Sequence, residues 1–312
     1  MPEVSQNSFV LNVYKEIPWT SHDAVARVRR ILGVRQVGHA GSLDPLAAGV
    51  LVVAVGRATK LMPHLMDLGK AYRGTFLFGR RTSSGDSGGE VVETGPVPEV
   101  DRERMQVLAR EFIGESTQVP PMVSALKQDG RRLYDLARAG IQVERAPRRI
   151  HVSRFEILSV ELPRVDFELE CGKGTYVRTL VEDLAARLPA LASIESLVRT
   201  KVGPFEVEDS CRLISPPGSE REGLMARAVS MAAAVGHLPA ARVDGTYVHH
   251  LRRGSVPPWK ALRFSQEPAV GSTVRLLGPE AELLAVATVD LLPGPADRPL
   301  AQSCTLRLDR VF

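Results

Sequence analysis

The sequence has few cysteines, few aromatic residues and no long apolar run, and each shortage excludes a class of protein. Its three cysteines, Cys171, Cys211 and Cys304, lie far apart in 312 residues. This argues against a disulfide framework and a zinc site, and it favours a reducing, cytoplasmic compartment. No stretch approaches the roughly 18 apolar residues of a membrane helix. Aromatic residues are 5% of the chain, too few for an aromatic-rich RNA platform.

Positive charge exceeds negative charge only slightly. The chain has 40 basic and 36 acidic residues, which leaves a net charge of +4. A basic balance favours a polyanionic partner without proving one. Hydrophobic residues make up 44%, enough for a globular core, and the length suggests two domains.

Hydrophobic periodicity gives a coarse map of the first 237 residues. Thr20-Ser21 begins a helix that ends at Gly33, because Ser and Thr cap helix starts and Gly ends them. Alternation of apolar and polar residues predicts a hairpin over residues 149–171. Apolar residues at helical spacing predict a helix from Val177 to Leu188. The other predicted elements are strands after Gly49 and over 70–79, a loop over 80–89, helices over 101–113 and 132–140, and a helical stretch from Gly223 to Val235.

The pattern changes at about Leu238, where short apolar runs are broken by Gly and Pro. We expect strands at residues 274–278, 282–290 and 304–312. The sequence therefore predicts two domains, residues 1–237 and residues 238–312.

The segment GHAGSLDPLAAGVL, residues 38–51, combines three glycines with a single acid, Asp44. A carboxylate on a rigid loop could act as a nucleophile or a general base. Asp44 followed by Pro45 is also typical of an ordinary helix start. Spacing alone favours the helix start, since helix caps far outnumber nucleophiles.

Three further residues allow both a functional and a structural interpretation. Arg178 falls in the first turn of a predicted helix, where the helix dipole disfavours a cation. An acid such as Asp44 would compensate, although Arg178 could instead reach solvent or Glu182. Tyr72 could stack on a base or belong to the core. His39 could be a surface residue or a wedge against a stacked nucleotide.

In their order along the chain, these segments resemble the motifs of the bacterial TruB-type tRNA pseudouridine synthases. The resemblance covers roughly residues 8–205 and continues more weakly to the C-terminus. Residues 38–51 are similar to the catalytic G-x-L-D motif. The other matching blocks are KAY at 70–72, QVPPMVSALKQDGRRLYDLARAG at 118–140, GTYVRTLVEDL at 174–184 and SLVRTKVGPF at 196–205.

The chain departs from the family pattern at several places. Residues 15–21 read KEIPWTS where the family has K-P-x-G-x-T-S, and residues 82–89 read TSSGDSGG where it has T-D-T-x-D-x-x-G. Val198 replaces an arginine before Arg199. None of these departures touches Asp44, Tyr72 or Arg178.

The resemblance implies an α/β (α+β) catalytic domain whose mixed, largely antiparallel sheet is flanked by helices. It implies a small PUA-like β domain after it. The implied reaction converts uridine to pseudouridine at position 55 in the T loop of tRNA, with no cofactor and no metal. The implied enzyme is a cytoplasmic monomer that binds the T arm and the acceptor stem of tRNA and no membrane.

The resemblance also implies roles for single residues. Asp44 is the nucleophile, Arg178 pairs with it, and Tyr72 stacks on a uracil flipped out of the loop. His39 fills the vacated stack, and Leu197 forms an apolar wall of the pocket. Further RNA contacts are implied within or beside the matching blocks by Gly41, Leu43, Lys70, Lys127, Lys173, Tyr176 and Arg199. Arg242, Arg252 and Arg253 are plausible phosphate contacts of the second domain, or solvated surface charges.

Two other classes of protein remain as alternatives. A non-catalytic RNA-binding or tRNA-folding protein would use the same basic loops without needing Asp44. A glycosidase with a carboxylate nucleophile would need two acids beside the scissile bond. No second acid stands out in a matching motif.

Overall fold

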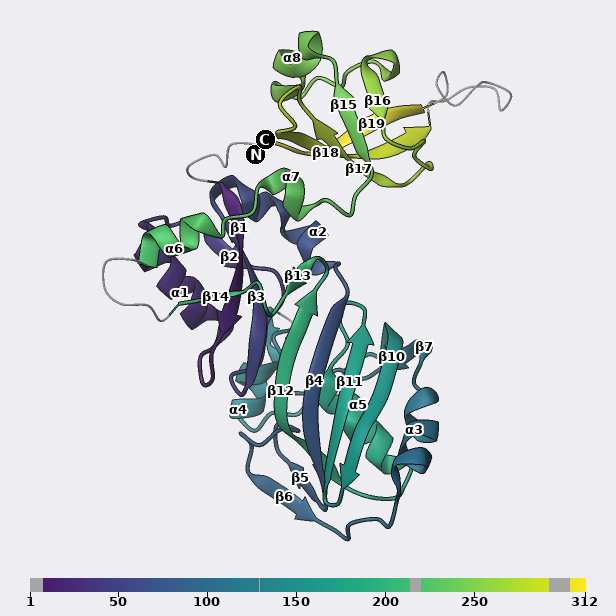
Figure 1. The fold of residues 1–312 in the computed structure, drawn as a ribbon. Coiled ribbons are helices and arrows are strands. Elements are labelled where there is room, and N and C mark those ends of the chain that lie inside the picture. The colour runs from purple at the N-terminus through teal and green to yellow at the C-terminus, as the bar shows by residue number, and fades with distance from the viewer. Residues whose placement is uncertain (1–7, 129, 214–219, 292–303) are drawn as a thin grey trace.

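A computed structural model describes residues 8–128, 130–213, 220–291 and 304–312, and its main feature is a ten-stranded sheet (Figure 1). Its strands lie in the order β14-β1-β3-β12-β4-β11-β10-β7, with β2 beside β3 and β13 beside β12. β1 is parallel to β14 and β12 is parallel to β3, while the other paired strands of this sheet are antiparallel. The strands are β1 (Phe9–Lys15), β2 (Val37–His39), β3 (Ala47–Val55), β4 (Lys70–Phe78), β7 (Gly114–Gln118), β10 (Arg148–Glu161), β11 (Arg164–Cys171), β12 (Ala192–Val202), β13 (Phe205–Glu206) and β14 (Cys211–Arg212).

Helices α3 (Arg102–Arg110) and α5 (Val177–Ala186) cover one face of the long strands, as Figure 1 shows. Met105 of α3 and Leu184 of α5 share an apolar cluster with Phe167 of β11. Full burial of one such side chain stabilises a fold by roughly 1.5–3 kcal/mol. The expected α/β fold, a mixed and largely antiparallel sheet flanked by helices, is confirmed.

Two elements that were predicted from short sequence patterns, a helix and a hairpin, are confirmed. Helix α1 (Ser21–Leu32) begins after Thr20, whose side chain forms a reciprocal capping pair with Asp23, and it ends at Gly33 with φ of 70°. The predicted hairpin forms from β10 and β11, and its alternating apolar residues face the core. The remaining helices are α2 (Met62–Met66), α4 (Leu133–Arg138), α6 (Glu220–Ala226), α7 (Met231–Ala234) and α8 (Val248–Arg252), with 3-10 turns at Gly56–Leu61, Gly245–Tyr247 and Trp259–Ala261.

Two expectations were wrong in part. The predicted loop over residues 80–89 begins with strand β5 (Arg80–Thr82), because β5 pairs with β6 (Val91–Thr94). The predicted helical stretch up to Val235 is two helices, α6 and α7. Val229 interrupts it, since its backbone N–H and C=O both bond to Val10 of β1. Residues 214–219, which precede this stretch, lie outside the described residues.

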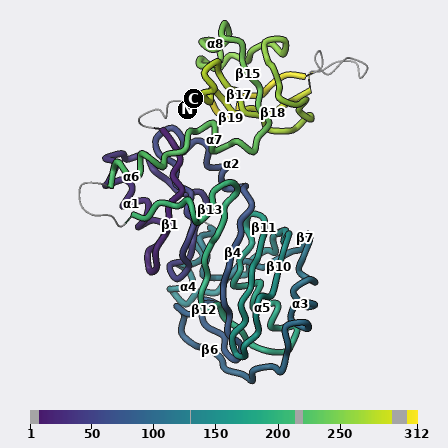
Figure 2. Tube along the Cα trace, viewed as in Figure 1, coloured from purple at the N-terminus to yellow at the C-terminus, as the bar shows by residue number. Residues whose placement is uncertain are grey.

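A second, five-stranded sheet follows, in the order β16-β15-β17-β18-β19. Figure 2 shows β15, β17, β18 and β19 of this sheet together at one end of the molecule. The three strands predicted after Leu238 are confirmed as β17, β18 and β19. Phe312 and Val286 share an apolar cluster with Val10 of the first sheet, so the two sheets are in contact. The second sheet also has an apolar cluster of its own, which includes Val274 and Leu306. The division into domains at residue 238 stays a prediction. The strands are β15 (Ala240–Val243), β16 (Leu262–Phe264), β17 (Thr273–Leu277), β18 (Leu283–Leu291) and β19 (Cys304–Val311), and a separate hairpin joins β8 (Lys127–Gln128) to β9 (Arg131–Arg132).

Within the described ranges, none of the helices has both the length and the apolar character needed to cross a membrane.

Candidate active site

Asp44 lies on the loop between β2 and β3, and buried side chains hold the backbone of this loop. The Leu43 N–H donates to Ser21 Oγ at 2.9 Å, and Ser21 Oγ donates to the Leu43 carbonyl at 3.2 Å. Lys15 Nζ donates to the Pro45 carbonyl at 3.3 Å. Gly41 has φ of 102°, a left-handed conformation that favours glycine. The loop is therefore fixed on both sides of Asp44.

Asp44 does not begin a helix, so the helix-start interpretation was wrong. The Ala47 N–H donates to the Asp44 carbonyl at 3.0 Å, which closes a turn that leads into β3. The chain cannot continue as a helix here because β3 pairs with β1 from Gly49 onward. The Asp44 side chain is thus not used as a helix cap.

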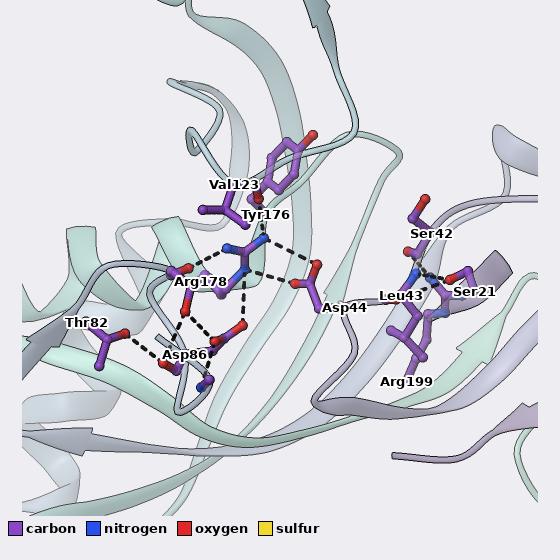
Figure 3. A network of polar contacts seen from close by, with 12 residues as sticks. Ser21, Ser42, Leu43, Asp44, Thr82, Asp86, Val123, Tyr176, Arg178 and Arg199 are labelled. Atoms are coloured by element: carbon purple, nitrogen blue, oxygen red, sulfur yellow. Dashed lines mark hydrogen bonds and ion pairs between the residues drawn. The ribbon is translucent and has the colours of Figure 1, made fainter. Parts of the chain in front are cut away.

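Arg178 of α5 meets Asp44 edge on (Figure 3). Arg178 Nε lies 2.9 Å from Asp44 Oδ2, and Nη2 lies 3.3 Å from Oδ1. Only 4% of the Arg178 side chain is exposed, against 41% of Asp44. Nη2 also donates to the Val123 carbonyl at 2.8 Å, and Nη1 donates to the Ser84 carbonyl. Three segments thus hold Arg178 in place, while part of the Asp44 carboxylate remains accessible to solvent.

Asp86 is a second acid at this site, and sequence reasoning missed it. Its Oδ2 lies 4.0 Å from Arg178 Nε. Ser84 Oγ donates to its Oδ1 at 2.5 Å, and the Gly88 N–H donates to the same oxygen at 3.0 Å. Asp86 is an acid alone in a Gly/Ser-rich loop, and this was the signal that could have indicated it.

The pKa of the Asp44 carboxyl is raised above its usual value, and burial is the largest cause. Loss of hydration raises this pKa, Arg178 lowers it, and Asp86 raises it again. An opposite charge in direct contact favours the ionised form. The arrangement supplies one aimed carboxylate with part of its surface free.

Tyr72 of β4 packs in the apolar cluster that also contains Leu43, the neighbour of Asp44 in the chain, and Val177, the neighbour of Arg178. Tyr72 is 7% exposed, and the same cluster includes Leu197. Burial raises the pKa of its hydroxyl, so the phenol stays protonated at neutral pH. The site therefore combines a carboxylate, a guanidinium, a phenol ring and aliphatic walls.

The other predicted contacts are spread around this centre. The pKa of His39 is lowered to about 4, chiefly by burial, and its ring lies edge-on to His22 at 5.4 Å. Lys70 Nζ donates to the Leu68 carbonyl at 2.7 Å. Lys173 pairs with Asp67 at 2.7 Å on the surface.

The remaining RNA contacts predicted from the sequence are Tyr176, Lys127 and Arg199. The backbone of Tyr176 bonds twice to the side chain of Gln118, at 2.8 and 3.1 Å. Lys127 is exposed on β8. Arg199 is buried and donates to protein carbonyls. Gly41 and Leu43 thus belong to the Asp44 loop itself, and Leu197 and Arg199 lie next to it. Lys127 and Lys173 lie on the surface.

In the part of the chain that the structure describes, no group of three His, Cys, Asp or Glu side chains is placed to hold a metal ion.

Comparisons with known proteins show which family this chain is similar to. Residues 29–177 match the model of the TruB family pseudouridylate synthase N-terminal domain. The tRNA pseudouridine synthase B of Moorella thermoacetica is 39% identical over 284 residues, which is 90% of this chain and 93% of that protein. The Geobacter sulfurreducens protein of the same name is 39% identical over 301 residues, 96% of this chain and 97% of that protein. A chain in the crystal structure of a Cbf5-Nop10-Gar1 complex has a TM-score of 0.74 and 25% identity, covering 98% of this chain and 85% of that chain.

The fold and these relatives define an enzyme of the pseudouridine synthase class, an isomerase. Within that class, the chain belongs to the TruB family of pseudouridylate synthases. The family resemblance drawn from the sequence is confirmed.

Proposed function

We propose that this enzyme converts uridine to pseudouridine in tRNA, at position 55 of the T loop, with Asp44 as the nucleophile. The relatives named tRNA pseudouridine synthase B support tRNA as the substrate. The observation that carries the proposal is the carboxylate of Asp44, which pairs with Arg178 on one edge while 41% of its side chain stays exposed. Its chain neighbour Leu43 packs in one apolar cluster with Tyr72.

In the proposed reaction the N1–C1′ bond of the target nucleotide breaks, the uracil turns, and a C5–C1′ bond forms. C5 loses its proton and N1 gains one, so no oxidant or reductant is consumed. The carboxylate of Asp44, held charged and aimed by Arg178, is the nucleophile and bonds to C6 of the base or to C1′ of the sugar. That bond breaks again as the C5–C1′ product is completed, so the free carboxylate is regenerated. The base must leave the loop to reach this recess. Tyr72 stacks on the base, Leu197 lines the pocket, and His39 fills the vacated stack.

The proposal extends to the rest of the tRNA. Lys70, Lys127, Lys173 and the second sheet would contact phosphates, with Arg242, Arg252 and Arg253 facing the acceptor stem. Arg252 already lies 3.7 Å from Glu282, so a phosphate would compete with that carboxylate. We also infer a cytoplasmic monomer, and the three buried free cysteines support a reducing compartment.

Unmodified tRNA, a T-arm hairpin and a tRNA with cytidine at position 55 form the test set. We expect one pseudouridine, at position 55, in the first two RNAs and none in the third, with a metal chelator present. Product at another uridine would refute the position. Binding without product in any RNA would favour the non-catalytic RNA-binding protein instead.

A further inference from the structure

Arg199 of β12 lies where the three central strands meet, and it is only 1% exposed. It pairs with Tyr72 of β4 on one side and with Gly49 of β3 on the other. The contact with β3 is tight, since a Cβ on Gly49 would lie 2.3 Å from the Arg199 carbonyl oxygen. The backbone of Arg199 therefore has little freedom to shift.

The guanidinium of Arg199 is directed at the loop that carries Asp44 (Figure 3). Its Nη2 donates to the Gly41 carbonyl at 3.2 Å, and its Nη1 donates to the Ser42 carbonyl at 3.1 Å. Its Nε donates to the Val50 carbonyl at 2.7 Å, beyond the loop. One planar group thus bridges the loop start and the strand that follows the loop. A lysine, with a single nitrogen, cannot reproduce this fork of donors.

The same guanidinium lies beside Tyr72. Arg199 opposes the rise that burial causes in the pKa of the Tyr72 hydroxyl. The side chain is therefore placed between the phenol ring and the loop of the carboxylate. At 1% exposure it offers almost no surface to a phosphate, and each of its three nitrogens already donates to a protein carbonyl.

We infer that Arg199 is a positioning residue, which holds the Asp44 loop in register with the strand of Tyr72 rather than binding RNA. The inference rests on the proposed function and deepens it. A small displacement of a reacting group can lower a rate about 100-fold without changing substrate binding. Arg199 acts on the Asp44 carboxylate only through the carbonyls of Gly41 and Ser42. We therefore expect its replacement to lower the rate of the chemical step rather than the affinity for tRNA.

The test compares Arg199→Lys and Arg199→Met with Val202→Ala, a matched control that is fully buried in the same strand. We expect single-turnover pseudouridine formation at saturating tRNA to fall roughly 10- to 100-fold in both Arg199 variants. The Kd for tRNA should stay within about threefold of wild type. Val202→Ala should lower Tm and leave the single-turnover rate within about twofold at temperatures well below Tm. Arg199→Lys keeps the buried charge and decides the matter if Arg199→Met does not fold.

Hydrogen exchange of the Leu43 amide supplies a readout that needs no RNA. We expect this amide to exchange at least about tenfold faster in Arg199→Lys than in Val202→Ala, because the loop loses its anchor. A weaker Kd with an unchanged single-turnover rate would show an RNA contact and overturn the inference. An unchanged rate with unchanged exchange would also overturn it. Faster exchange in a chain whose wild type forms no pseudouridine would refute the proposed function and leave the anchor standing.

Discussion

Arg178 and Asp44 are 134 residues apart in the chain, and yet two nitrogens of the guanidinium face the two oxygens of the carboxylate at 2.9 and 3.3 Å. Arg178 stands in the first turn of α5, where the partial positive charge of the helix end disfavours a cation. Asp44 and Asp86 supply the compensating charge. Arg178 is unfavourable for helix α5 on its own, but its position there lets it orient the Asp44 carboxylate.

Asp44→Asn tests the nucleophile. The amide cannot form the covalent bond that the carboxylate forms, so kcat should fall by at least about 10³-fold. The Kd for tRNA, measured by filter binding, should change less than about threefold, because Asp44 contributes no attraction to phosphates. Asp44→Glu is the control that keeps the charge and moves it by one methylene. Full activity of Asp44→Asn would remove Asp44 from the mechanism.

Arg178→Ala separates positioning from binding. Arg178 is buried and touches the carboxylate rather than the surface, so its removal should lower kcat about 100-fold or more. The Kd for tRNA should stay within a few fold. Arg178→Lys keeps the charge but loses the edge-on pair of donors, and we expect an intermediate kcat. Equal losses in kcat and in affinity would contradict the positioning role.

Asp86→Asn changes the pH dependence of turnover. Asp44 acts when ionised, so kcat rises with pH through the pKa of its carboxyl. Burial and the nearby charge of Asp86 both raise that pKa above 3.8. Removing the charge of Asp86 should therefore move the acid limb of the kcat profile to lower pH. Ser87→Ala, on the same loop, is the control. An acid limb that moves to higher pH would show that Asp86 acts mainly by orienting Arg178.

His39 should remain neutral in mildly acidic solution. Its pKa is lowered from 6.5 to about 4 by burial and by the neighbouring His22 and Arg199. Between these two pH values the unfolded chain binds the proton more strongly, so the free energy of unfolding should decrease as pH falls through this window. NMR titration of the imidazole should give a midpoint near 4, with His39→Gln used for assignment. A midpoint near 6.5 would mean that the ring is hydrated.

Binding to tRNA should depend steeply on salt. Lysines and arginines that contact phosphates displace counterions from the tRNA. The Kd should therefore increase at least about tenfold between roughly 50 and 200 mM salt. Fluorescence titration of labelled tRNA measures this slope. Arg252→Gln and Arg253→Gln should each reduce the slope if the second sheet contacts the acceptor stem. A flat response would exclude phosphate contacts as the main source of affinity.

Much of the fold could be predicted from the sequence because its signals are local. Thr20 and Gly33 bound a helix through their own hydrogen-bonding and conformational preferences. Alternation along residues 149–171 marked a hairpin with one buried face. The segment after Gly223 was harder, since the break at Val229 comes from a bond to Val10, more than 200 residues away.

The sequence by itself determined the family, the residue types at the site and the elements that carry them. It left Asp44 between a helix cap and a nucleophile, because Asp-Pro fits both. Only the tertiary structure excluded the helix cap and placed Arg178 against the Asp44 carboxylate. The pairing of β12 with β3 and β4 holds Arg199 beside the Asp44 loop, and a bridge between Asp86 and Ile194 of β12 brings the second acid near the guanidinium. Contacts between segments so far apart depend on which strands pair. The alternation within one strand shows which of its faces is buried but not which distant strand lies beside it.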